Sequence, residues 1–261
     1  NHTLLEAVKT ISEQPITIEV DTINGLAKIS YQNGLFSLPI DNSDEYPQTQ
    51  EVDANANTII ISSNILSDNI TRSVFATGQE EIRRVMNGIY FDITTEDITF
   101  VASDGHKLVR NKTYKTKGTE KAAFILPKKP ATLLKNLLPK ETGDVQISFD
   151  DRNAVFTLDQ YTLTCRLIEG RYPNYNSVIP QNNPHRATID RSAFISALKR
   201  VSVFSNAASS LIKLRLDLNN IQISGQDIDF STSAEETMMC QYEGTPMSIG
   251  FKSTFLIKTC F

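Results

Sequence analysis

The 261-residue sequence has little of what marks secreted, membrane-spanning or zinc-binding proteins. Its three cysteines, Cys165, Cys240 and Cys260, are odd in number and far apart, which argues against a disulfide framework and against a zinc site. No stretch approaches the roughly 18 consecutive apolar residues of a membrane-spanning helix. The first residues also lack the basic segment and apolar core of a secretion signal. We therefore expect a protein of the reducing cytoplasm that needs no metal, cofactor or membrane.

An excess of positive charge is also lacking. The sequence has 26 lysines and arginines against 30 aspartates and glutamates, a formal net charge of −4. A tight, sequence-specific DNA-binding protein usually carries a basic stripe. Any contact with nucleic acid must therefore depend on local positive charge. A weak, sliding association fits a net charge of −4 better than tight binding does.

What the sequence does have is internal repetition. Thr3-Leu4-Leu5 returns as Thr132-Leu133-Leu134, at an offset of 129 residues. Tyr46-Pro47 returns as Tyr172-Pro173, at an offset of 126 residues. Further matches follow in the same order, and the small drift in offset is what short deletions in loops produce. Self-similarity at a steady interval indicates copies of one structural unit.

The repeats predict three copies of this unit, two of them incomplete. We expect the C-terminal half of a first domain at residues 1–54, a complete second domain at residues 55–180, and the N-terminal part of a third domain at residues 181–261. The alternative is a chain of two unrelated α+β domains in which the matches arise by chance.

Periodicity predicts strands and short helices within each copy. In residues 211–218, isoleucine and leucine alternate with charged residues, the pattern of a strand with one buried face. A helix is predicted over 191–204, with Phe194, Leu198 and Val201 on one stripe. A second helix is predicted over 131–138, with four leucines on its stripe: Leu133, Leu134, Leu137 and Leu138. We expect an α+β fold of mostly antiparallel sheets with helices packed on one face.

Four motifs carry a resemblance to a known family. They are Arg83-Arg84-Val85-Met86-Asn87-Gly88, Ser103-Asp104-Gly105-His106-Lys107-Leu108, Leu126-Pro127-Lys128-Lys129 and Gly170-Arg171-Tyr172-Pro173. In order and spacing, the chain resembles the bacterial DNA sliding clamps, the beta subunits of DNA polymerase III. The second motif departs from the family's usual Thr-Asp-Gly-His-Arg-Leu at two positions, and the lysine there lacks the planar fork of arginine.

The resemblance implies three similar clamp domains per subunit, with antiparallel sheets outside and paired short helices lining the inner face. Two subunits would join head to tail into a ring around duplex DNA, and parts of domains one and three would lie outside this sequence. The implied function is that of a DNA polymerase processivity factor, which is not an enzyme and has no catalytic residues. The implied partners are double-stranded DNA, bound without sequence specificity, a second subunit, the replicative DNA polymerase, the clamp loader and other proteins with a clamp-binding motif.

The resemblance also implies three sets of site residues. The pocket for partner peptides would contain Met86, Ser103, Gly105, His106, Lys107, Leu108, Pro173 and Val178. Contacts with DNA phosphates would come from Arg83, Arg84, Lys128, Lys129, Lys199 and Arg200. The dimer interface would join Phe36 and Leu38 to Val203 and Phe204. For these last four residues, ordinary core packing is the alternative.

Two other functions compete with this one. In a hydrolase, Asp104 would orient His106 as a general base. However, no Gly-Xaa-Ser-Xaa-Gly elbow, phosphate-binding loop or metal-spaced cluster accompanies this pair. The second alternative is a repeat-built protein-interaction scaffold that has no role on DNA.

Overall fold

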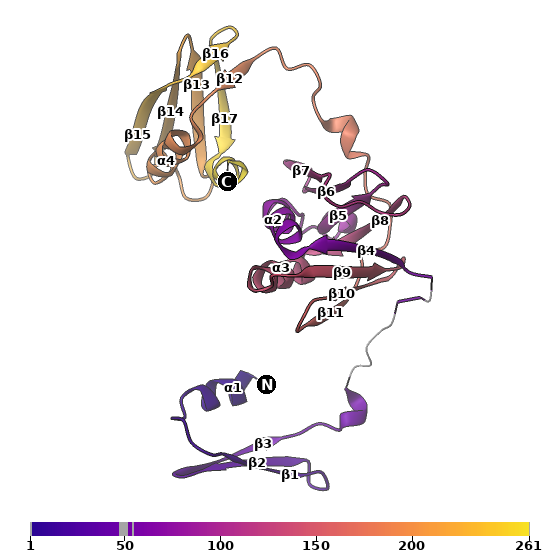
Figure 1. Cartoon of the computed structure of the whole chain (residues 1–261). Coiled ribbons are helices and arrows are strands. Elements are labelled where there is room, and N and C mark those ends of the chain that lie inside the picture. The colour runs from indigo at the N-terminus through magenta and orange to yellow at the C-terminus, as the bar shows by residue number, and fades with distance from the viewer. Residues whose placement is uncertain (1, 47–51, 54, 261) are drawn as a thin grey trace. The chain divides into compact units, whose positions relative to one another are not determined.

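The computed structural model describes residues 2–46, 52, 53 and 55–260, and the chain divides into two compact units, residues 1–50 and 51–261 (Figure 1). The first unit holds the helix α1 (His2–Lys9), a three-stranded antiparallel sheet in the order β1-β2-β3, and a short 3₁₀ helix, η1 (Ser43–Glu45). Its strands are β1 (Thr17–Asp21), β2 (Leu26–Tyr31) and β3 (Gly34–Pro39). Ala27 and Ile29 of the central strand are its buried apolar residues. Pro47, part of one predicted repeat, lies outside the described residues.

The second unit begins with two four-stranded antiparallel sheets and a pair of helices. One sheet has the order β11-β10-β9-β4, with β4 (Asn57–Ser62), β9 (Asp144–Phe149), β10 (Asn153–Thr157) and β11 (Thr162–Arg166). The other has the order β7-β6-β5-β8, with β5 (Gly88–Ile93), β6 (Ile98–Ser103), β7 (Leu108–Thr113) and β8 (Ala122–Pro127). The helices α2 (Ser63–Val74) and α3 (Lys128–Leu137) lie side by side against the sheets (Figure 1). Short 3₁₀ helices are η2 (Arg84–Met86), η3 (Leu138–Lys140) and η4 (Tyr175–Val178).

One apolar core joins these two sheets and two helices. Leu66 and Ile70 point into it from α2, one helical turn apart, as expected of an amphipathic helix. Phe91 stacks on Phe124 of the neighbouring strand, with ring centroids 4.4 Å apart, and meets Phe100 edge-on at 4.7 Å. Such aromatic pairs stabilise a fold beyond the area they bury.

The remainder of the second unit repeats the plan with a single larger sheet. Its order is β15-β14-β13-β17, with β13 (Leu211–Asp217), β14 (Asn220–Asp227), β15 (Thr232–Met239) and β17 (Met247–Lys252). β12 (Arg186–Thr188) pairs separately with β16 (Gln241–Glu243), and the helices are α4 (Arg191–Ser202) and α5 (Ser253–Thr259). The predicted stripe of α4 is confirmed, because Phe194, Leu198 and Val201 are all buried.

Alternation correctly predicted β13, whose residues are exposed and buried in turn, but it was wrong for Leu218, which follows the end of the strand and is 75% exposed. The chain reverses after it at Asn219, which adopts a φ of 59°, a conformation that asparagine tolerates better than most residues. The predicted α+β class with antiparallel sheets is confirmed. The domain boundaries at 54/55 and 180/181 stay a prediction. No helix in the described part of the chain is long and apolar enough to cross a membrane.

The predicted leucine stripe of α3 was partly wrong. Ala131, Leu134 and Leu138 are fully buried, Leu137 is half-buried, and Leu133 is 45% exposed. Residues at spacings of three and four share a helix face, whereas Leu133 is turned about 100° away from Leu134. Leu134 lies three and four positions from the buried Ala131 and Leu138 and shares their face, and Leu133 lies at the edge of it.

We expect Leu134→Ala to lower the free energy of unfolding by about 2–5 kcal/mol, because it removes buried methyl groups and leaves a cavity. Leu133→Ala on the same helix is the matched control and should change it by less than about 1 kcal/mol. Urea unfolding followed by circular dichroism would measure both. Equal effects of the two substitutions would contradict this assignment of the buried face.

Candidate functional site

The helices concentrate the positive charge of this acidic chain. Helices α1 to α5 contain nine lysines and arginines against two acidic residues, a net charge of +7. Because the chain as a whole carries −4, its strands, turns and loops together carry −11. Each helix pair in the second unit buries its apolar stripe against a sheet, which leaves most of its charged side chains exposed, although Arg200 of α4 turns back to Glu236 of β15.

The predicted DNA-contacting pair Arg83 and Arg84 lies outside α1 to α5, at the start of the 3₁₀ helix η2 that precedes β5. Arg83 Nη2 is 2.8 Å from Glu80 Oε2, and Arg84 Nε is 3.3 Å from Glu81 Oε2. Surface ion pairs of this kind contribute little to stability. They do neutralise the loop locally, so neither arginine is an isolated cation.

The other four predicted DNA contacts are on helices. Lys128 and Lys129 form the first turn of α3, with Lys129 exposed and Lys128 half-buried. The helix dipole disfavours cations at this end, so the two lysines do not stabilise α3. Lys199 and Arg200 occupy the last turn of α4, where the dipole favours them. Arg200 there makes two hydrogen bonds to Glu236, Nε to Oε2 at 3.0 Å and Nη2 to Oε1 at 2.5 Å.

Sequence analysis missed the other five helical cations, which are Lys9 on α1, Arg72 on α2, Lys135 on α3, Arg191 on α4 and Lys258 on α5. The repeat was a signal that relates two of them. Lys258 occupies the position in α5 that Lys135 occupies in α3, at an offset of 123 residues.

The motif from Ser103 to Leu108 forms the turn between β6 and β7. Ser103 Oγ donates to the carbonyl of Lys107 at 2.8 Å and accepts from the N–H of Gly105 at 3.1 Å. Gly105 has a φ of 89°, and a Cβ there would lie 2.5 Å from a nitrogen of Arg83. The positive φ favours glycine at this point, whereas the contact is with the end of a flexible side chain that can move aside.

Asp104 holds this turn together. Its Oδ1 accepts from the N–H groups of His106 and Lys107, both at 3.0 Å, and its Oδ2 binds Lys107 Nζ. Burial by itself would raise the pKa of Asp104, but the Lys107 ammonium and the two N–H groups hold that pKa below its usual value. Both oxygens of Asp104 are thus engaged by groups other than the imidazole of His106, which is not the arrangement of a carboxylate that orients a general base.

A cavity of about 350 Å³ opens beside this turn. Three of the predicted pocket residues line it: Met86, His106 and Lys107. Two phenylalanines that the sequence analysis missed line it as well, Phe75 and Phe255 of α5. Lys107 Nζ lies 4.1 Å from the ring centroid of Phe255, within the range of a cation–π interaction. Apolar walls beside convergent charged groups are typical of a site that binds an extended peptide.

Leu108, Pro173 and Val178 lie elsewhere in the second unit. Leu108 packs in a small apolar cluster with Val101 and Tyr172. Pro173 lines a different cavity of about 710 Å³, and Val178, in η4, is exposed. The structure therefore brings Met86, His106 and Lys107 together around one cavity and leaves these three outside it.

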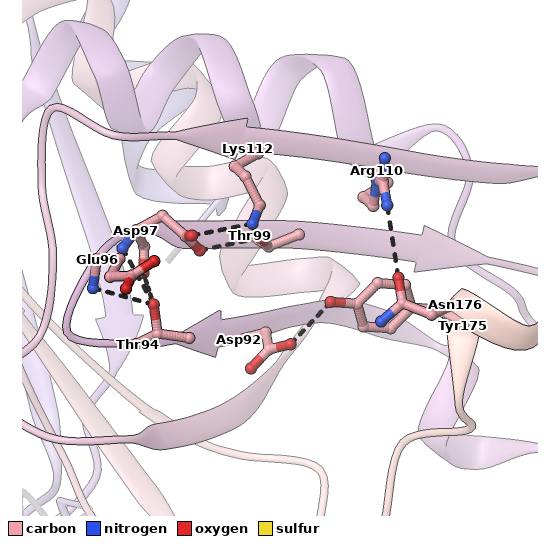
Figure 2. A network of polar contacts seen from close by, with 9 residues as sticks. All are labelled: Asp92, Thr94, Glu96, Asp97, Thr99, Arg110, Lys112, Tyr175 and Asn176. Carbon is pink, nitrogen blue, oxygen red and sulfur yellow. Dashed lines mark hydrogen bonds and ion pairs between the residues drawn. The ribbon is translucent and has the colours of Figure 1, made fainter. Parts of the chain in front are cut away.

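Pro173 and Val178 belong to a segment, residues 167–178, that is tied to the sheet at several points. The N–H of Ile168 donates to the carbonyl of Ile125 at 3.1 Å. Tyr172 stacks on Tyr90 of β5, with ring centroids 4.7 Å apart. Farther along, the Tyr175 hydroxyl donates to Asp92 Oδ2 at 2.8 Å (Figure 2).

The same sheet is braced at the turn between β5 and β6. Asp97 is buried there, and Lys112 Nζ of β7 lies 2.9 Å from its Oδ2 (Figure 2). Arg110, on the same strand as Lys112, donates to Asn176 Oδ1 at 3.4 Å (Figure 2). The 167–178 segment is therefore held by both β5 and β7, which gives Pro173 and Val178 defined positions.

The predicted interface residues are on the rim of their domains. Phe36 and Leu38 are half-buried on β3, an outer strand of its sheet, and the Phe36 ring lies 5.4 Å from that of Tyr31. Val203 and Phe204 follow α4 and are exposed. In the same domain as these two, β15 is an outer strand, with no strand on its far side in the described part of the chain.

Repeated sheets backed by basic helix pairs define the class of DNA clamps, and comparisons with known proteins agree. The family model for the central domain of the DNA polymerase III beta subunit matches residues 60–174, and that for its C-terminal domain matches residues 176–260. The chain belongs to this family, the bacterial beta sliding clamps.

Individual relatives are distant in sequence. The Beta sliding clamp of Synechococcus elongatus is 25% identical over 253 residues, which cover 94% of this chain and 66% of the relative. That of Caulobacter vibrioides is 27% identical, with 99% of this chain and 71% of the relative covered. The sequence thus spans about two thirds of the length of these relatives.

Solved structures share the fold over nearly the whole chain. A sliding clamp from Bartonella birtlesii, crystallised with griselimycin, has a TM-score of 0.87 at 27% identity and is covered over 70% of its length. The DNA polymerase III subunit beta of Pseudomonas aeruginosa, at 24% identity, has a TM-score of 0.87 and shows the fold alone. Each alignment covers 99% of this chain.

We expect Tyr175→Phe to weaken the fold in a pH-dependent way. Burial, and then the bond to the Asp92 carboxylate, raise the pKa of Tyr175 to about 12 from its usual 10. Above pH 10 the unfolded chain ionises first, so this stabilisation is complete below pH 10 and is lost as pH rises towards 12. The variant should be about 1 kcal/mol less stable at pH 7, and its disadvantage should shrink by pH 12.

Urea unfolding at the two pH values would measure this effect. Tyr161→Phe, at an exposed tyrosine in the turn after β10, is the control and should leave the stability unchanged at pH 7. A disadvantage of Tyr175→Phe that stays constant from pH 7 to pH 12 would contradict the role given to its hydroxyl.

Proposed function

We propose that this protein is a DNA polymerase processivity factor, a sliding clamp that encircles duplex DNA and tethers the replicative polymerase to its template. The observation that carries the proposal is the separation of charge, +7 on the helices against −11 on the rest of the chain. It is supported by the membership of the chain in the beta sliding clamp family. In the assembled ring, the helices would face the DNA and the acidic sheets and loops would face outwards.

The physical task of such a protein is to stay near DNA without gripping it. Lysine and arginine contacts with phosphates position a protein on the duplex but read no sequence. Acidic outer surfaces would repel DNA from the wrong face of the ring. A partner bound to a ring that cannot leave the template experiences a high effective concentration of DNA. No bond is made or broken in this mechanism, so the protein is proposed to act without catalysis.

For the DNA-facing surface we propose Lys128, Lys129, Lys199 and Arg200, joined by Arg72 and Lys258 from the neighbouring helices. Arg83 and Arg84 are proposed with a smaller share, because Glu80 and Glu81 offset their charge. Arg200 is offset in the same way by Glu236. Lys129, exposed on the first turn of α3, is therefore proposed as one of the main contacts.

Partners would dock by a short apolar peptide at the cavity lined by Met86, His106 and Lys107. The aromatic walls from Phe75 and Phe255 would receive an apolar side chain of the peptide. Ser103 and Gly105 shape the turn that carries His106 and Lys107. Pro173 and Val178 of the 167–178 segment, with Leu108 of β7 packed beside Tyr172, would extend this site, as would be needed for a peptide of several residues.

The double variant Lys128→Glu/Lys129→Glu tests the proposed function on DNA. We expect the unaltered chain to associate weakly with duplex DNA and to lose affinity as salt is raised from 50 to 200 mM. The double variant should reduce binding at 50 mM salt by about tenfold or more. Glutamate in a first helical turn is favoured by the dipole, so α3 should remain folded. Fluorescence anisotropy with a labelled duplex would measure the affinity of each protein for DNA.

Lys115→Glu/Lys117→Glu makes the same change of charge in the loop between β7 and β8 and is the control. It should reduce DNA binding by less than about threefold, since only long-range attraction is altered. Equal losses in the two double variants would overturn the assignment to α3. Complete absence of salt-sensitive association in the unaltered chain would favour an interaction scaffold without a role on DNA.

Met86→Ala tests the peptide site. We expect it to weaken binding of a synthetic peptide that carries the clamp-binding motif of the replicative polymerase by about tenfold, the usual effect of removing an apolar anchor. Ile82→Ala, at an exposed side chain in the same loop, should leave binding unchanged. Fluorescence polarisation with a labelled peptide would give both dissociation constants. Unchanged binding by Met86→Ala would remove this cavity from the proposed site.

A further inference from the structure

The turn between β14 and β15 exposes two large apolar side chains. Ile228 and Phe230 are each 79% exposed, on either side of Asp229. Scattered exposed apolar residues are normal on a protein surface. Here two of them lie together at the tip of one hairpin, beside an outer strand, which concentrates exposed apolar surface at one place.

This tip is an ordered turn. Asp227 is buried, and its Oδ1 accepts from the N–H groups of Asp229 at 3.0 Å and Phe230 at 3.3 Å. The N–H of Ser231 donates to the carbonyl of Ile228 at 3.3 Å, and Ser231 has a φ of 55°. A turn held in one conformation loses little entropy when its apolar side chains are buried in a complex.

The tip lies beside the end of α4. Asn206 Nδ2 donates to Asp229 Oδ2 at 3.3 Å, and Asn206 Oδ1 caps the turn that follows the helix. Gly225 of β14 also approaches this region closely, because a Cβ added there would lie 3.0 Å from the carbonyl oxygen of Val201. Val203 and Phe204, the predicted interface residues, stand between Val201 and Asn206 in the chain. The hairpin tip therefore adjoins the predicted dimer surface.

We propose that the hairpin tip, Ile228 and Phe230, is a second apolar anchor of the dimer and that a second copy of this chain covers it. This inference rests on the proposed clamp function, in which the domain after residue 180 joins the first domain of a partner subunit. Exposed outer strands tend to pair with another chain. β15, which follows the tip, is such a strand, and β3 of the first unit is another.

β3 has uncharged, mainly apolar residues that fit an apolar tip. Its six residues, Gly34–Pro39, include no charged side chain. Leu35 is 61% exposed and stands next to the predicted interface residue Phe36. Contact with an uncharged strand takes no ionised group of β3 out of water, and the carboxylate of Asp229 at the tip already accepts a hydrogen bond from Asn206. The other outer strand of that sheet, β1, carries Glu19 and Asp21 and fits an apolar tip less well.

The chain offers a matched control at the other end of the same sheet. Leu218 is 75% exposed and lies in the turn between β13 and β14. It therefore resembles the tip residues in being an exposed apolar residue of a hairpin turn, but it lies at the opposite end of β14 from the tip. A general effect of surface hydrophobicity on self-association would act through Leu218 as well as through the tip. A specific interface would involve the tip alone.

Sedimentation velocity on the whole chain would test the inference, with Ile228→Ser/Phe230→Ser compared with Leu218→Ser and with Phe204→Asp. We expect the tip variant to raise the dimer dissociation constant by at least tenfold, and Leu218→Ser to change it by less than twofold. Phe204→Asp should give a monomer, because its carboxylate would be desolvated against an apolar partner. All substituted side chains are exposed, and thermal unfolding would check that each variant is folded.

The outcomes distinguish failure of the second anchor from failure of the proposed clamp dimer. A dimer that is lost in Phe204→Asp but unchanged in the tip variant would overturn the second anchor and leave the clamp dimer standing. Equal weakening by the tip variant and by Leu218→Ser would also overturn it. A monomeric unaltered chain, or an unchanged dimer in Phe204→Asp, would overturn the dimer of the proposed function itself, and the tip inference with it.

Discussion

Packing of a helix pair against one face of a sheet is the constraint on which the rest of this structure depends. In the second unit, Leu66 and Ile70 of α2 and Leu134 and Leu138 of the α3 region fill one core with the phenylalanines of β5, β6 and β8. Once the apolar stripe of each helix is buried, its other face must be polar. The exposed faces of these helices can therefore carry charge without any change in the packing of the core.

Positive charge on those faces would allow an acidic protein to make the contact with DNA that we propose. The lysines on the first turn of α3 oppose the helix dipole, so their presence is not explained by the stability of that helix. Glutamates pair with Arg83, Arg84 and Arg200 and reduce the net positive charge at these three arginines. A surface of moderate positive charge is compatible with sliding, because each phosphate contact is weak and is readily exchanged for the next.

The proposed peptide site depends on backbone geometry more than on any single reactive group. Asp104 uses both carboxylate oxygens to close the turn that carries His106 and Lys107. The 167–178 segment is fastened to the same sheet by Tyr172 and Tyr175. Because turn and segment are attached to one rigid sheet, the residues proposed to meet a peptide are positioned before it arrives, which reduces the entropy lost on binding.

From the sequence alone, the repeats and the alternation in 211–218 indicated the fold class, and the clamp motifs indicated the family. The spacing of apolar residues indicated the buried stripe of α4. Motifs and periodicity are local features, and periodicity reports directly on which residues face a core. Only the tertiary structure decided that Leu133 turns away from the core while Leu134 enters it, and that Phe75 and Phe255, 180 residues apart in the chain, line one cavity with Met86. It also decided that Asp104 binds a lysine and backbone N–H groups, and that Asn206 ties the hairpin tip to the end of α4. Contacts between distant segments depend on how elements pack in three dimensions, and one chain's residue pattern does not encode them position by position.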